Sequence, residues 1–123
     1  LILMKKPFFA MFFLLFFVGG VSGWEDSKEN KQIFKMIYTI NLAVGTLESQ
    51  TCRKSNLAKE GYEALIELVL NTVDEGQVSK KDSFDMLAAT LEARQKQRSK
   101  ANSSESCKGA EDLVNMILKN ESN

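Results

Sequence analysis

The chain contains no histidine, only one proline and only two cysteines. Without histidine there are no imidazole general bases, no Ser-His or Cys-His nucleophile pairs, and no haem or zinc sites that rely on imidazole. The two cysteines lie too far apart for a zinc motif or a C-x-x-C redox motif. Glycine-rich phosphate loops, the G-x-S-x-G elbow and EF-hand loops are also missing. We therefore expect a protein that is not an enzyme and that needs no cofactor or metal.

The sequence also lacks an excess of positive or negative charge. The chain has 16 basic and 16 acidic residues, so its formal net charge is zero. A neutral protein has no overall field that would attract nucleic acid or an anionic membrane. We expect no nucleic-acid partner.

A long apolar run occurs only near the start of the sequence. Lys5 and Lys6 precede the run Phe8–Val18, and small residues ending at Gly23 follow it. This order is typical of a cleaved signal peptide. The run is also shorter than the ~20 residues that a membrane-spanning helix needs. We expect no integral membrane association after cleavage.

These features predict a signal peptide at residues 1–23 and a single helical domain at residues 24–123. The protein is therefore expected to be exported. The bacterial periplasm is the favoured location, with extracellular secretion as the alternative. The glycosylation sequons at Asn102 and Asn120 matter only in a eukaryotic host.

Apolar residues recur at helical spacing in four segments, and no stretch shows the alternation of a strand. The segments are residues 27–52, 56–75, 79–93 and 105–119. Four helices with short connections are typical of an up-down bundle, in which neighbours are antiparallel. The predicted fold is therefore all-α, a small up-down four-helix bundle.

The third segment is the least regular of the four. Ser79 and Asp82 fit a helix start, and the apolar face consists of Phe84, Leu87, Ala88 and Leu91. After Ala93 the apolar periodicity ends. Residues 94–106 are therefore predicted as a polar tail of this helix followed by a loop, and the pattern does not decide how far the helix continues.

The cysteines agree with the predicted topology. Cys52 closes the first segment and Cys107 opens the fourth, and in an up-down bundle these places lie at the same end on neighbouring helices. Export would allow a disulfide to form and persist. We predict one intramolecular disulfide, with free thiols or an intermolecular bridge as the alternatives.

Two rows of like charges are candidate partner-binding residues. One row is basic and the other is acidic, and a solvated helix face is the simpler interpretation of each. They are Arg94, Lys96 and Arg98 in the polar tail after the third segment and Glu60, Glu63 and Glu67 in the second segment. The basic row has no aromatic residues between its charges, which argues against a groove for single-stranded nucleic acid.

A polar residue within an apolar arc marks a candidate ligand pocket. Asn41 lies in the apolar arc of the first segment, and a buried amide must form hydrogen bonds or destabilise the fold by about 1–3 kcal/mol. The amide could bind a ligand held near Tyr38 and Tyr62, or it could bond within the bundle. Few aromatic residues follow the signal peptide, which leaves little material for a large pocket.

The leading functional hypothesis is an exported helical protein that acts by binding another protein, as an inhibitor, immunity or accessory factor. It rests mainly on the chemistry that the sequence lacks. The alternatives are a carrier of an apolar small molecule or lipid and, less favoured, a hydrolase that uses carboxylates alone.

Overall fold

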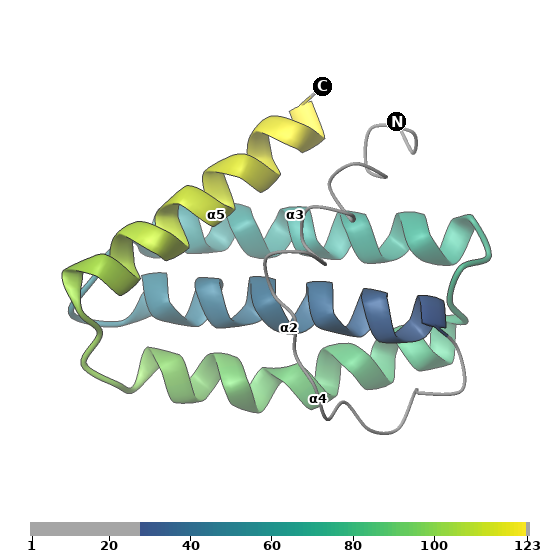
Figure 1. Ribbon diagram of the computed structural model, residues 1–123, viewed down its shortest axis with the longest axis horizontal. Coiled ribbons are helices and arrows are strands. Elements are labelled where there is room, and N and C mark those ends of the chain that lie inside the picture. Colours follow the sequence, from purple (N-terminus) through teal and green to yellow (C-terminus); the bar gives the residue numbers. More distant parts are fainter. Residues whose placement is uncertain (1–27, 123) are drawn as a thin grey trace.

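The computed structural model describes residues 28–122, which form four α-helices (Figure 1). Successive helices run in opposite directions (Figure 1), which confirms the predicted all-α, up-down bundle. The helices are α2 (Lys28–Glu48), α3 (Ser55–Asp74), α4 (Lys80–Arg98) and α5 (Ser104–Ser122). The predicted signal peptide lies outside the described residues.

The helix α2 is the centre of the bundle. It packs against each of the other three helices, whereas α3 and α4 barely touch one another. More than half of its residues are buried, including its whole predicted apolar stripe. That stripe is Ile33, Ile37, Ile40, Val44 and Leu47. A square bundle gives every helix two neighbours, but here α4 and α5 both lie against α2, and α5 also packs against α3.

Local hydrogen bonds determine where the helices begin and end. The Ser79 hydroxyl accepts a hydrogen bond from the Asp82 N–H at 3.0 Å, as the sequence predicts. The Ser103 hydroxyl accepts one from the Ser106 N–H at the start of α5, also at 3.0 Å. At the end of α3, Gly76 has a φ of 77°, a left-handed conformation that glycine adopts without steric cost.

One disulfide links Cys52 to Cys107, with 5.4 Å between their Cα atoms. This confirms the predicted intramolecular pairing. The helix α2 ends earlier than predicted, at Glu48, so Cys52 lies in the turn that follows. Cys107 lies in the first turn of α5, where the capping bond of Ser103 orders the chain. The bridge is compatible with export.

The predicted apolar face of the third helix is wrong. The buried residues of α4 are Ser83, Met86 and Thr90. Phe84 is 59% exposed and Leu91 is 43% exposed, and neither belongs to the core. Of the other two predicted face residues, Leu87 is half-buried and Ala88 is exposed. The helix therefore packs against α2 with a face that is largely small and polar.

The helices α2 and α4 approach each other closely at Gly45. A Cβ atom added to Gly45 would lie 2.9 Å from the carbonyl carbon of Arg94 and closer still to its oxygen. Only glycine allows two backbones to approach so closely. Next to Gly45 no large side chain fits between the two backbones, and Thr90, one turn before Arg94, faces α2 through its hydroxyl. Further along α4 a large side chain is accommodated, because Met86 is fully buried. The helix α4 continues to Arg98, and residues 99–103 connect it to α5.

Candidate functional site

The first residue of the predicted basic row, Arg94, lies between three helices. Its Nε and Nη2 atoms donate to the Glu48 carboxylate on α2, at 3.0 and 2.6 Å. Its guanidinium also lies over the ring of Tyr62 on α3, 4.4 Å from the ring centre. The hydrogen bonds to Glu48 raise the pKa of Arg94 above its usual value, so the side chain stays charged. Arg94 therefore joins helices and is not a free charge on the surface.

The other two basic residues are more accessible. Arg98 lies one turn beyond Arg94, and its Nη1 is 3.7 Å from the same Glu48 carboxylate. Lys96 is exposed and forms no ion pair within the described part of the chain. Within the basic row, Arg94 is bound to Glu48, Arg98 is half-exposed and Lys96 is exposed. The three side chains therefore do not form one continuous binding surface.

The acidic row is exposed along α3. Glu60, Glu63 and Glu67 all face solvent, and Asp74 continues the row toward the end of the helix. Over residues 28–122 none of these four carboxylates forms an ion pair. Unneutralised carboxylates on one helix face make this part of the surface electronegative.

The three residues of the predicted ligand pocket each have different contacts. Tyr38 stacks on Phe34 within α2, with 6.2 Å between ring centres. Asn41 is buried, and its Nδ2 donates to the Thr90 hydroxyl of α4 at 2.7 Å. Tyr62 lies beneath the guanidinium of the α4 arginine. Asn41 thus bonds within the bundle, which is the alternative that its sequence position left open.

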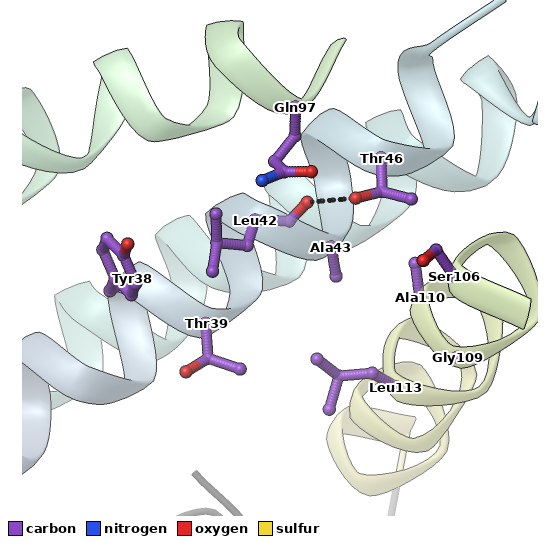
Figure 2. A pocket seen from close by; sticks show the side chains of 10 residues that line it. All are labelled: Tyr38, Thr39, Leu42, Ala43, Thr46, Gln97, Ser106, Gly109, Ala110 and Leu113. Carbon is purple, nitrogen blue, oxygen red and sulfur yellow. Dashed lines mark hydrogen bonds between the residues drawn. The ribbon is translucent and has the colours of Figure 1, made fainter. Parts of the chain in front are cut away.

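A groove of about 370 Å³ is present elsewhere, where α4 and α5 diverge over α2 (Figure 2). Its floor is α2, its walls are α5 and the end of α4, and its lining is mainly apolar. The lining residues are Tyr38, Thr39, Leu42, Ala43 and Thr46 from α2, Gln97 from α4, and Ser106, Gly109, Ala110 and Leu113 from α5.

The polar groups of this groove are few and partly occupied. The Thr46 hydroxyl donates to the Leu42 carbonyl at 2.9 Å (Figure 2), so its proton is not available to a ligand. Gln97 projects from α4 above Leu42 (Figure 2). The groove can therefore accept an apolar group and offers it little polar recognition. Of the predicted pocket residues, only Tyr38 lines it.

A second unusual surface lies where α4 faces α3. Arg94 marks this side of α4, because its guanidinium contacts Tyr62 of α3. Leu91 and Leu87 precede Arg94 at the i−3 and i−7 positions, so helical spacing places them on the same side. Phe84 lies two turns before Leu91 along this stripe. The stripe contains both exposed large apolar residues of α4, Phe84 and Leu91.

The helix α3 carries a matching row. Ile66 and Val73 follow Tyr62 at i+4 and i+11, on the side toward α4, and both are half-buried. Leu70 lies beside them and is 56% exposed. We call the combined area the α3/α4 apolar surface. It consists of exposed Leu70, Phe84 and Leu91 and half-buried Ile66, Val73 and Leu87.

Sequence reasoning missed the α3/α4 apolar surface and the groove for different reasons. Periodicity finds the most apolar face of a helix and assigns it to the core, so it placed Phe84 and Leu91 inside. The groove depends on how far α5 diverges from α4, and no sequence pattern reports that angle. The only available signal was Gly45, whose presence within a long helix indicates a close backbone approach.

Comparisons of the chain with protein-family models, with curated proteins and with solved structures find no match. No helix within residues 28–122 is long and apolar enough to cross a membrane. The same residues contain no cluster of cysteine, aspartate or glutamate side chains that could hold a metal ion. The groove over α2 and the α3/α4 apolar surface are therefore the two candidate functional sites.

Proposed function

We propose that this protein is exported and acts by binding another protein, as an inhibitor, immunity or accessory factor. One observation carries the proposal: the large apolar side chains Leu70, Phe84 and Leu91 are exposed, and helical spacing from the Tyr62–Arg94 contact places them on the facing sides of α3 and α4. An apolar patch on a protein surface commonly marks an interaction site, whereas scattered apolar residues do not. Aromatic residues such as Phe84 are also common at the energetic centres of interfaces.

Export is part of the same proposal. The leader-like sequence before Gly23 and the Cys52–Cys107 disulfide both support it, and the periplasm is the favoured location. Sequencing the N-terminus of the protein released by its native host tests this directly. We expect a product that begins close to Trp24. A product that keeps the run Phe8–Val18 in the membrane fraction would contradict both export and cleavage.

A carrier of an apolar small molecule is the second candidate, because the groove over α2 has a volume of about 370 Å³. That volume is at the low end for small-molecule sites, which span roughly 300–1,000 Å³. The mainly apolar lining suits an acyl chain or another apolar group. The carboxylate-only hydrolase receives no comparable support, because Glu60, Glu63 and Glu67 face solvent along one helix.

Site-specific photo-crosslinking distinguishes the two functions. A photoreactive phenylalanine analogue replaces Leu91 on the α3/α4 apolar surface, Gly109 in the groove, or exposed Lys96 as the control. Protein binding predicts one saturable protein adduct at position 91, absent at position 96 and lost when Leu70→Ser is added. The carrier function instead predicts a small-molecule adduct at position 109. If position 91 gives no more protein adduct than position 96, the protein-binding proposal fails.

A further inference from the structure

We propose that the α3/α4 apolar surface binds a basic amphipathic helix of a partner protein. This inference rests on the proposed protein-binding function and names the chemistry of the partner. It combines two independent properties of the surface, the spacing of its exposed apolar side chains and the sign of the charges beside them.

The spacing of the apolar side chains suits a helix as the ligand. Phe84 and Leu91 are two turns apart on α4, a distance of roughly 10 Å along its axis. Leu70 projects from the antiparallel α3, so the three exposed side chains lie on two helices. Each helix also carries a half-buried apolar residue on this side, Ile66 on α3 and Leu87 on α4. An amphipathic helix presents its apolar anchors at i, i+3 or i+4, and i+7, a spacing that matches the two-turn separation of Phe84 and Leu91.

Carboxylates border the apolar area on both helices. On α3, Glu67 and Asp74 lie at i−3 and i+4 from Leu70, and both are exposed. On α4, Glu92 follows Leu91 directly and is exposed. None of these three carboxylates forms an ion pair among residues 28–122. A partner with lysine or arginine beside its apolar anchors would neutralise them.

The exposed lysines near this surface do not cancel the acidic border. Lys81 donates to Asp85 at 2.9 Å within α4, so those two charges neutralise each other. Lys80, at the start of α4, remains as a single exposed cation near the turn. Other exposed cations lie toward the far ends of the two helices, at Lys59 on α3 and at Lys96 and Arg98 on α4. The charge immediately beside Leu70 is negative, because Glu67 and Asp74 are its charged neighbours at i−3 and i+4.

The same charges disfavour two other occupants. A second copy of this chain would bring Glu67, Asp74 and Glu92 against an identical acidic border, and like charges across an interface oppose association. An anionic membrane surface would be repelled for the same reason. The geometry thus points to a cationic helix rather than to self-association or lipid.

A peptide-binding experiment with the oxidised protein tests the inference. The probe is an amidated 18-residue helical peptide with leucine at i, i+3, i+4 and i+7 and lysine at its other positions. The matched control peptide replaces every lysine with glutamate. We expect the lysine peptide to bind in a salt-dependent manner and to shift the backbone NMR resonances around Leu70, Phe84 and Leu91. The glutamate peptide should bind at least tenfold more weakly.

Single substitutions locate the site. Leu91→Ser and Leu70→Ser remove exposed anchors, so the fold should be kept while affinity for the lysine peptide falls about tenfold each. Glu67→Gln should weaken binding several-fold at low salt and have little effect at high salt. The matched control is Glu105→Gln, because this exposed carboxylate lies on α5, outside the surface, and should leave affinity unchanged.

Several results would overturn the inference. Two concern the peptides: equal binding of the lysine and glutamate peptides, or lysine-peptide binding that persists in the Leu70→Ser and Leu91→Ser variants. The other two concern the surface itself: dimerisation that buries it, or equally tight binding of phosphatidylglycerol vesicles to it. The proposed function is tested separately by crosslinking at position 91. If a protein adduct forms there but the lysine peptide does not bind, only the partner class is wrong. If neither occurs, the protein-binding function fails as well.

Discussion

The Glu48 carboxylate at the end of α2 accepts two hydrogen bonds from the Arg94 guanidinium, which also lies over the ring of Tyr62. Lysine cannot reproduce the planar, two-pronged contact or the stacking. We therefore predict that Arg94→Lys lowers the free energy of unfolding by about 1–3 kcal/mol. Urea unfolding measures the loss.

A double-mutant cycle with Glu48→Gln then separates the coupling between Glu48 and Arg94 from the individual losses. The control is Lys96→Ala, at an exposed position on the same helix, which should change stability by less than about 0.5 kcal/mol. If Arg94→Lys is as neutral as the Lys96 variant, the interaction does not stabilise the fold.

Two glycines in helices should respond to alanine in opposite directions. At Gly45 the new methyl group meets the Arg94 backbone, which cannot move aside without displacing α4. Gly45→Ala should therefore destabilise the protein by about 1–3 kcal/mol, despite the better helix propensity of alanine. At Gly109 nothing lies within 4 Å of the added atom. Gly109→Ala should stabilise the protein by about 0.5–1 kcal/mol. Thermal unfolding of both variants is the check, and changes of the same sign would contradict the close α2–α4 packing.

Removing one partner of the buried hydrogen bond between Asn41 and Thr90 should destabilise the protein more than removing both partners. Thr90→Val leaves the Asn41 amide without its acceptor at the α2–α4 contact, so we expect a loss of about 1–3 kcal/mol. The double variant Asn41→Leu/Thr90→Val removes both partners and should recover part of that loss. Denaturant unfolding of the three variants, with the m-value monitored, tests this. A double variant that is as unstable as the sum of the single changes would show that packing matters more than the hydrogen bond.

Breaking the disulfide should lower stability without changing the fold. Its two cysteines are separated by 55 positions, and closing a loop of this size stabilises a protein by about 4 kcal/mol in the chain-entropy model. We expect Cys52→Ser, Cys107→Ser and the reduced wild-type protein to lose similar amounts, within the usual range of about 2–5 kcal/mol. Helix content should persist at low temperature by circular dichroism. Wild-type stability that is insensitive to reductant would contradict this.

The helices and the disulfide could be predicted from the sequence because each depends on local or pairwise signals. Ile33, Ile37 and Ile40 repeat at helical spacing and are buried, and Ser79 caps α4 as expected. The direction in which α4 faces could not be predicted. Its predicted apolar stripe, which includes Phe84, does not pack against α2; α4 buries Ser83, Met86 and Thr90 instead, and its backbone meets Gly45 at Arg94.

The candidate sites were less predictable still, because they depend on how helices meet. Helical periodicity predicts a solvated position for both Arg94 and Glu60. Arg94 is instead bound between three helices, whereas Glu60 faces solvent. Asn41 and Tyr62 each contact a residue of α4, Thr90 and Arg94 respectively. The groove over α2 follows from the divergence of α4 and α5, which is a tertiary property.

The disulfide also changes what a broken backbone would do to this protein. Lys100 is exposed in the connection 99–103, so it offers an accessible peptide bond between α4 and α5. A protease that cleaves there produces two polypeptides, yet the Cys52–Cys107 bond still joins α5 to the turn after α2. The released helix remains tethered beside its packing partners, at a high effective concentration. In a protease-rich compartment, α5 would therefore be lost only after both a cut and a reduction.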